Sequence, residues 1–313
     1  MPCSLAMKAA RIHRFGGPEV IVVEDVPRPL AEAGELLVRV ADAGVGPWDA
    51  LIREGKSKVS PKPPLTLGAD LSGVVEAVGP GVAQFKKGDE IYGVTNPQFC
   101  GAQAEYAIAS ANMVAPKPQR LSHNEAASAP VVAVTAWQML FDYAHAHAGQ
   151  TVMILGAAGN VGAYAVQLAA KANLCVVAVV GQKDIEYVRN LGAEIPLNYQ
   201  LETFAGEVRS VDVVIDTVGG ETRERLLRVL SPGGILVSVV SPEAMPQRSD
   251  VRSVFFYVEV TTARLNVISE LFDRGELLPQ VGTILPLQEV RAAHNMLAGA
   301  PHKRGKIVLQ VTV

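Results

Sequence analysis

The chain has 313 residues, a length that suits two domains of moderate size better than one. Hydrophobic residues make up 49% and charged residues 19%, which excludes a disordered chain and a coiled coil. The net charge of −3 gives no electrostatic reason to expect nucleic acid or an anionic membrane as a partner. No apolar run approaches the roughly 20 residues of a membrane span, and the first residues lack the features of a signal peptide.

The three cysteines, Cys3, Cys100 and Cys175, lie far apart in the sequence. An odd and sparse set is not a disulfide framework, and the close pairing of a zinc site is absent. We therefore expect free thiols in a reducing compartment, no metal, and a cytoplasmic protein.

From Met7 to about residue 109, short β-like runs alternate with turns rich in glycine and proline. The apolar runs at 36–40, 73–78 and 90–94 are examples. Many short strands with few helical stretches predict a small barrel or sandwich.

The pattern changes at Ser122, where Ser122 and Glu125 have the spacing of a capping box before an alanine-rich helix. Apolar strands and amphipathic helices then alternate. Strands this uniformly apolar are covered on both faces, as in the parallel sheet of the doubly wound α/β class. We expect strands at 151–155, 175–180, 211–215 and 235–239, and helices at 135–146, 161–172, 184–191 and 222–230.

The last part of the chain predicts a strand at 254–260, a helix at 262–273 and an edge-like strand at 306–311. A strand this late, after an α/β unit, predicts a return to the first domain.

The segment 152–162 is the most informative, because an apolar strand runs into a turn with Gly156, Gly159 and Gly162 that opens a helix. Gly159 lets the backbone approach a pyrophosphate, and Gly162 lets the helix pack closely on the strand. The free N–H groups at the helix start favour an anion. The pattern predicts a dinucleotide-binding turn; the alternative is a tight turn with no ligand.

The tip of the second strand bears on the choice between NAD and NADP. NAD-specific sites place an acid there to bind the ribose hydroxyls. This chain has Gly181, Gln182 and Lys183 instead. Gly181 leaves room for a 2′-phosphate and Lys183 could pair with it, which favours NADPH. The alternative is that Lys183 is a solvated charge at a helix start, followed by Asp184 as a helix cap.

Several further motifs accompany the glycine turn, at 18–20, 68–75, 78–82, 87–91, 104–106, 216–220 and 231–234. Together they resemble the medium-chain dehydrogenase/reductase superfamily, and most closely its zinc-free NADPH:quinone oxidoreductases, the zeta-crystallin-like family. The resemblance covers nearly the whole chain. It implies a Rossmann doubly wound parallel sheet inserted into a GroES-like β-barrel domain, with the active site in the cleft. The implied limits are 1–125 and 263–313 for the GroES-like domain and 126–262 for the Rossmann domain.

The alcohol dehydrogenase branch of this superfamily binds zinc through a Cys and a His, and the matching positions here are Gly46 and Ala69. Neither side chain can donate a lone pair to a metal. Asp49 and Asp70 remain nearby; the alternative for them is hydrogen bonding within loops and turns.

The resemblance also implies roles for individual residues. A substrate wall would include Trp48, Asp49 and Leu51, with ordinary core as the alternative. Many relatives carry Asn at the position of Gly46 and Tyr at that of Leu51, so no catalytic residue or proton donor can be named here. The implied cofactor-binding residues are Thr135 beside the nicotinamide, Gly156, Ala158, Gly159, Asn160, Val161 and Gly162 around the diphosphate, Gly181, Lys183 and Tyr199 near the adenosine ribose, Thr217 and Val218 along the cofactor's inner half, and Phe255 over the carboxamide.

Without zinc, no Lewis acid polarises an alcohol or an ordinary ketone, so the acceptor must already be electrophilic. We predict an NADPH-dependent enzyme that transfers hydride without a metal to a quinone or an activated α,β-unsaturated carbonyl. The alternatives are a zinc-free alcohol or aldehyde oxidoreductase, and an NADPH-binding sensor or structural protein with little turnover. The expected partners are a small-molecule acceptor and a second copy of the chain, paired through the apolar strand at 254–260.

Overall fold

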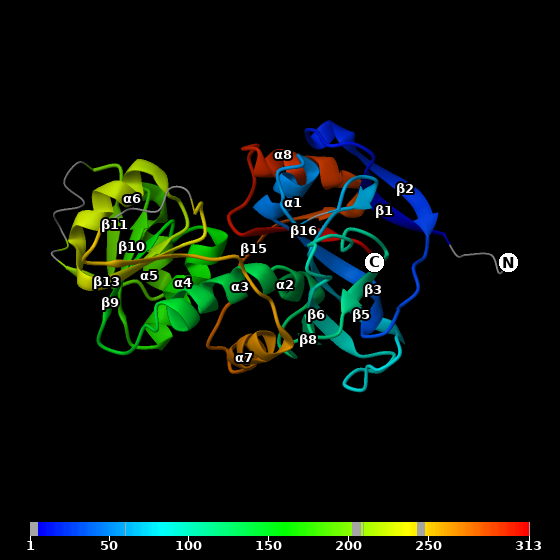
Figure 1. Cartoon of the computed structure of the whole chain (residues 1–313), viewed down its shortest axis with the longest axis horizontal. Helices are drawn as coiled ribbons and strands as arrows, with labels where there is room; N and C mark the ends of the chain where they lie inside the picture. Colours follow the sequence, from blue (N-terminus) through cyan, green and yellow to red (C-terminus); the bar gives the residue numbers. More distant parts are fainter. Residues whose placement is uncertain (1–5, 60, 202–207, 209, 243–247, 313) are drawn as a thin grey trace. The chain divides into compact units, whose positions relative to one another are not determined.

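The computed structural model describes residues 6–59, 61–201, 208, 210–242 and 248–312. The chain forms two compact units, one made of Met1–Val131 with Val260–Val313 and the other of Val132–Glu259. Both ends of the chain therefore build the first unit, and the second unit is inserted between them (Figure 1). The resemblance put these transitions after residues 125 and 262, a few residues from the limits observed.

The inserted unit contains a six-stranded parallel sheet in the order β11-β10-β9-β12-β13-β14. The chain enters at the centre, winds outward to one edge, returns to the centre and winds to the other edge. This confirms the doubly wound sheet predicted from the sequence. The strands are β9 (Thr151–Leu155), β10 (Cys175–Val180), β11 (Ile195–Asn198), β12 (Val211–Asp216), β13 (Leu230–Ser238) and β14 (Arg252–Phe255).

Helices cover both faces of this sheet (Figure 1). Right-handed crossovers in opposite directions from the centre place α4 and α5 on one face and α6 on the other. Strands enclosed in this way are apolar throughout, and Met153, Val177 and Leu236 belong to one buried cluster. The helices are α3 (Pro130–Trp137) with a π-helical turn at Gln138–Tyr143, α4 (Asn160–Lys171), α5 (Ile185–Asn190) and α6 (Gly220–Leu226).

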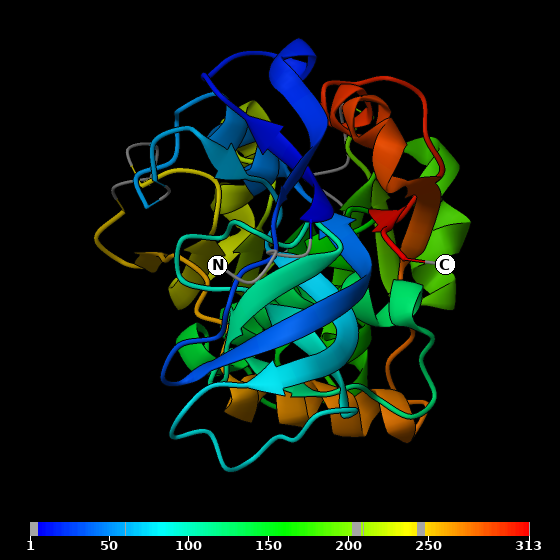
Figure 2. The same cartoon turned by 90° about the vertical axis from the view of Figure 1, so that its right-hand side faces the viewer.

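The first unit is rich in strands. A three-stranded sheet has the order β2-β1-β4, and a seven-stranded sheet has the order β15-β16-β3-β5-β6-β8 with β7 also paired to β3. Figure 2 looks onto this unit, with β3 and β5 curving in blue and cyan and α7 in orange below them. The elements are β1 (Ala6–Ile12), β2 (Ile21–Pro27), β3 (Glu35–Val45), α1 (Pro47–Arg53), β4 (Leu65–Thr66), β5 (Asp70–Val78), β6 (Glu90–Val94), β7 (Tyr106–Ser110), β8 (Val114–Pro116), α2 (His123–Ala127), α7 (Thr262–Asp273), β15 (Val281–Pro286), α8 (Val290–Leu297) and β16 (Lys306–Gln310).

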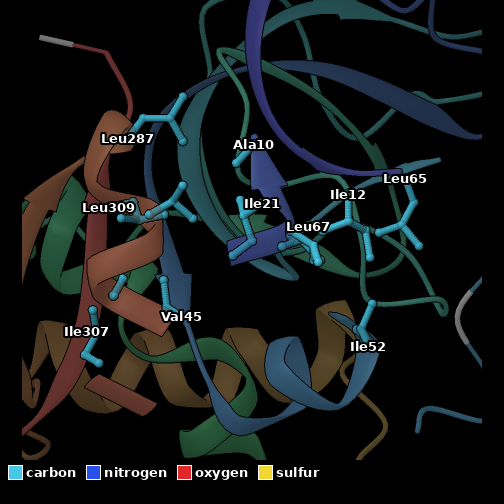
Figure 3. Close-up of a cluster of buried hydrophobic side chains, with 13 residues drawn as sticks. Ala10, Ile12, Ile21, Val45, Ile52, Leu65, Leu67, Leu287, Ile307 and Leu309 are labelled. Carbon is cyan, nitrogen blue, oxygen red and sulfur yellow. The ribbon is translucent and has the colours of Figure 1, made fainter. Parts of the chain in front are cut away.

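The late strand does return to the first unit, but the expectation that it lies at an edge is wrong. β16 lies between β15 and β3 and pairs with both. Its apolar side chains pack with those of the N-terminal part: Ile307 and Leu309 share a buried cluster with Ile12, Val45 and Ile52 (Figure 3). Full burial of one such side chain contributes about 1.5–3 kcal/mol, so this core draws the two ends of the chain together.

Several expected elements of the inserted unit have different limits. The helix expected at 222–230 is observed at Gly220–Leu226, and the strand expected at 235–239 begins earlier, at Leu230. The strand expected at 254–260 ends at Phe255, because the ring of Phe256 stacks on Tyr143 with centroids 4.3 Å apart. The backbone N–H of Glu259 donates to Gln138 Oε1 at 3.0 Å, so this segment packs on the π-helical turn and leaves the sheet. The helix expected at 135–146 begins earlier, at Pro130, where proline suits the first turn of a helix.

Helix α1 is held in place by its last residue, Arg53, which is only 2% exposed. Arg53 Nε donates to Gly16 O at 3.1 Å, and Nη1 lies 2.9 Å from His294 Nδ1 on α8. Because a guanidinium only donates, His294 accepts at Nδ1 and is neutral. Burial, and then the charge of Arg53, lower the pKa of His294 to about 3.

We predict that His294 destabilises the protein as the pH falls. The unfolded chain binds a proton on this ring near pH 6.5 and the folded chain only near pH 3, so each pH unit between them should cost about 1.4 kcal/mol of unfolding free energy. His294→Asn keeps an acceptor and does not titrate. In denaturant titrations from pH 7 to pH 4, the unfolding free energy of the variant should rise relative to that of the wild type as the pH falls. A difference that stays constant with pH contradicts this assignment.

Candidate functional site

A cleft of about 900 Å³ lies in the inserted unit at the carboxyl ends of β9, β10 and β12. The strand order reverses between β9 and β12, which is where doubly wound sheets bind their ligands. Thr135, Asn160, Val161, Gly162 and Phe255 are not among its lining residues. The other residues expected at a cofactor do line it: Gly156, Ala158, Gly159, Gly181, Lys183, Tyr199, Thr217 and Val218.

Gly156 must be glycine for two reasons. Its φ of +74° is unfavourable for any side chain, and a Cβ there would lie 2.5 Å from Thr217 Oγ1 and 2.7 Å from Val218 Cγ2. The Thr217 hydroxyl in turn donates to Leu155 O at 2.8 Å, which joins the ends of β12 and β9. The backbone of this turn therefore lines the cleft directly, beside Thr217 and Val218.

The first turn of α4 lies against the same segment. A Cβ on Gly162 would lie only 2.2 Å from Gly156 O, so the helix can start here only without a side chain. Gly159 is the N-cap, and the intrahelical bonds begin with Ala163 N donating to Gly159 O at 2.8 Å. The N–H groups of Asn160, Val161 and Gly162 precede that bond and are the ones that can donate to an anion. These residues can thus contribute backbone groups without lining the cleft.

The tip of β10 contributes neutral amides and one basic residue. Gln182 Oε1 accepts from Asn198 Nδ2 at 3.0 Å, and Gln182 N donates to Gln200 Oε1 at 3.3 Å. Lys183 is the basic residue among the lining residues, and Asp184, also in the lining, is the N-cap of α5. Several lining residues were not predicted to bind a cofactor, although their positions at or near the carboxyl ends of β10, β11 and β12 were a usable signal: Val179, Val180, Gln182, Asp184, Gln200 and Thr222.

Below the cleft, a fully buried carboxylate fixes the segment that follows β12. Asp216 accepts from the N–H groups of Val218 and Gly219 at 3.0 and 2.7 Å and from Ser238 Oγ at 2.8 Å. Arg223 Nη1 lies 3.5 Å from the same carboxylate. The backbone at Thr217 and Val218 is therefore rigid where it borders the cleft.

The three residues expected at a substrate wall belong to α1 in the first unit. Leu51 is 47% exposed, Trp48 is half-buried and Asp49 is completely buried. Asp49 Oδ2 accepts from Gly46 N at 2.8 Å and so closes the first turn of α1. Hydrogen bonding within a turn, the alternative considered for Asp49, is thus present.

Asp70 also has well-defined partners. Its Oδ1 accepts from Val131 N at 3.0 Å, and its Oδ2 accepts from Lys306 Nζ at 2.8 Å. The Lys306 ammonium lies 3.9 Å from the ring centroid of Trp48, a cation–π contact. A Cβ on Gly46 would lie 2.4 Å from two atoms of the Trp48 ring. The indole therefore fills the space that a larger residue at position 46 would need.

No group of three or more His, Cys, Asp and Glu side chains within the described ranges is placed to hold a metal ion. Cys100 and Cys175 are free, half-buried thiols, and burial raises the pKa of each. Cys3 lies outside the described residues. Among the residues that the structure describes, no helix has the length and apolar character needed to cross a membrane.

Comparison with known proteins identifies the family. Residues 32–119 match the alcohol dehydrogenase GroES-like domain, and residues 191–309 match the family described as zinc-binding dehydrogenase. The quinone oxidoreductase of Rattus norvegicus is 30% identical over 323 residues, which cover 97% of each chain. The chain belongs to the zinc-free quinone oxidoreductase family of medium-chain dehydrogenases/reductases.

Solved structures agree with this assignment. The quinone oxidoreductase from Coxiella burnetii has a TM-score of 0.90 and 31% identity, covering 98% of this chain and 100% of that one. A structure titled NAD-dependent alcohol dehydrogenase has a TM-score of 0.88 and 30% identity, with 98% and 100% covered. The predicted fold is therefore confirmed, and the protein is an oxidoreductase of a nicotinamide-dependent family.

We predict that Gly162→Ala destabilises the inserted unit, because the new methyl group would overlap the Gly156 carbonyl. The expected loss in unfolding free energy is about 1–3 kcal/mol, typical of overpacking. Gly181→Ala is the matched control, since its φ is −79° and its Cβ would have no neighbour nearer than 3.8 Å. Denaturant unfolding of both variants checks this. Equal stabilities would show that α4 does not start as tightly against the turn as described.

Proposed function

We propose that this protein is an NADPH-dependent oxidoreductase that transfers hydride, without a metal, to a quinone or an activated α,β-unsaturated carbonyl. The observation that carries the proposal is the cleft at the strand reversal, where the residues directly after β10 are Gly181, Gln182 and Lys183, and the acidic residue of the lining, Asp184, comes after them at the N-cap of α5. An acidic residue at that tip would bind the ribose hydroxyls of NAD and repel a 2′-phosphate.

The residues of the cleft fit a dinucleotide. The closely packed Gly156 and Gly162 form a cradle that leaves no room for a side chain, and the amides at the start of α4 can hold the diphosphate. Lys183 and Tyr199 border the end where the adenosine ribose and its 2′-phosphate would lie. When bound, the cofactor supplies a hydride, and the protein holds it in place and excludes water.

The choice of acceptor rests on the residues near α1. Gly46 and Ala69 offer no metal ligand, so an acceptor that needs a Lewis acid is disfavoured. The Trp48 indole, fixed by Lys306, offers a flat aromatic surface that suits a planar acceptor. A quinone or an enone needs no further activation, because its reduction gives a delocalised anion.

We also propose a homodimer that forms through the edge of the parallel sheet. β14 pairs with β13 and lies at the end of the sheet order, and Tyr257, just beyond it, is 70% exposed. An edge strand offers unpaired backbone groups, which favours pairing with a second copy.

We predict that Lys183→Ala weakens NADPH binding by about tenfold or more and leaves NADH binding nearly unchanged, because only NADPH carries the 2′-phosphate. Lys171→Ala removes the same charge from the exposed end of α4, outside the cleft lining, and should alter neither affinity. Calorimetric titration of the three proteins with both cofactors measures this. Tighter binding of NADH by the wild type would overturn the NADPH assignment.

We expect NADPH oxidation with quinones and activated enones, and none with simple alcohols, aldehydes or ketones. A panel of acceptors followed by the loss of NADPH absorbance checks this, together with elemental analysis of the purified protein. Turnover of alcohols alone would favour the alcohol oxidoreductase alternative, to which the NAD-dependent alcohol dehydrogenase structure draws attention. NADPH binding without turnover of any acceptor would favour a sensor or structural role.

A further inference from the structure

Reduction of a quinone or an enone requires one proton for each hydride, and the proposed function leaves the source of that proton open. The inference below rests on that function and concerns a buried carboxyl group close to the residues expected at the acceptor. Asp49 is completely buried in the first unit, two residues before the exposed Leu51 and next to Trp48.

The two oxygens of the Asp49 carboxyl group have different surroundings. Oδ2 accepts from Gly46 N, whereas Oδ1 is buried and makes no well-formed hydrogen bond in the part of the chain that the structure describes, although the Gly68 amide lies near enough to act on the carboxyl group. Buried polar atoms are almost always paired, so an unpaired carboxyl oxygen in a well-packed region indicates a site that water or a ligand completes. Ala69, at the position where zinc-binding relatives have histidine, has no polar side chain to offer.

Other unpaired polar groups lie around the same backbone segment. Thr95 Oγ1 and both amide atoms of Gln103 are buried without a partner among the described residues, as is Trp48 Nε1. Thr95 N donates to Ala69 O at 3.0 Å, and Gln103 packs against Gly68, where a Cβ would lie 2.6 Å from Gln103 Cγ. Hydroxyl and amide groups of this kind can hold a water molecule or an acceptor oxygen by hydrogen bonds. They extend the polar site beyond Asp49 itself.

The charged and titratable groups that act on Asp49 come from three other segments. Lys306 on β16 favours its ionised form, Asp70 on β5 opposes it, and the thiol of Cys100 lies close enough to be affected by its charge. Desolvation is the largest effect and raises the pKa of Asp49 to about 7, against the Gly46 amide, Lys306 and the Gly68 amide, which lower it. A carboxyl group of this kind is protonated in a substantial fraction of molecules at neutral pH and can release its proton beside a cation.

We propose that Asp49 supplies the proton that completes reduction of the acceptor. Hydride addition brings two electrons and leaves an oxyanion on the acceptor. The Asp49 O–H bond breaks as a new O–H bond forms on this oxyanion, directly or through one water, which gives the hydroquinone from a quinone and the enol of the saturated product from an enone. The resulting carboxylate lies near the Lys306 ammonium, which is itself held by Asp70, and it regains its proton from solvent.

Asp49→Asn tests this, because the amide oxygen still accepts from Gly46 N and the group no longer titrates. In the wild type, kcat should fall as the pH rises above about 7 and should show a solvent isotope effect. The variant should have a kcat lower by about 10²-fold or more, with a flat pH profile over this range. Asp42→Asn is the matched control: Asp42 is also buried, with a pKa raised to about 6 by desolvation, but it lies on β3 and not on α1.

A second measurement does not depend on activity. Carboxyl carbon NMR of the wild-type protein should show one aspartate resonance that titrates near pH 7 and is missing in Asp49→Asn. A resonance assigned to Asp49 that titrates near pH 4 would overturn the inference, as would an unchanged pH profile of kcat in an active variant. If the wild type reduces no acceptor, the proposed function fails, and the inference fails with it. If the wild type is active and Asp49→Asn keeps the same pH profile of kcat, the proposed function stands and only the role of Asp49 as proton donor is rejected.

Discussion

The start of α4 lies so close to the turn after β9 that no side chain fits between Gly162 and the Gly156 carbonyl. This contact fixes where the helix begins, and so it aims the amides of its first turn at the cleft. The contacts of Gly156 with Thr217 and Val218 extend the constraint to the end of β12, where Asp216 holds the backbone from below. The dinucleotide-binding properties of the inserted unit therefore follow from a few positions where the residue can carry no side chain.

The first unit depends on a different constraint, the return of the C-terminal strand. β16 completes the apolar core beneath α1 and also brings Lys306 next to Asp70 and Trp48. A buried lysine is tolerated because a carboxylate pairs with it and an aromatic ring covers it. The same strand that closes the sheet thus sets the charges around Asp49, which links the discontinuous fold to the chemistry we propose.

The sequence predicted best the limits of those helices and strands that depend on a local pattern of residues. The limits of β9, β10 and α7 match the expected ones, because uninterrupted apolar runs and a threonine cap define them. The limits near Phe255 and Pro130 were missed because contacts such as Phe256 on Tyr143 decide them, and such contacts are not encoded in local periodicity. The environment of Asp49 was equally hidden, since Lys306 lies far along the chain and only the fold brings it near.

The positions of the glycines in the turn after β9 were predicted, and their physical reasons are now visible as specific close approaches. Hydrogen–deuterium exchange with and without NADPH tests the central claim most directly, because it reports which backbone amides the cofactor protects. We predict slower exchange at residues 156–163 and at the tip of β10, with the β-rich unit little changed at β1 and β2. Unchanged exchange at the turn after β9, with NADPH at saturating concentration, would contradict the account.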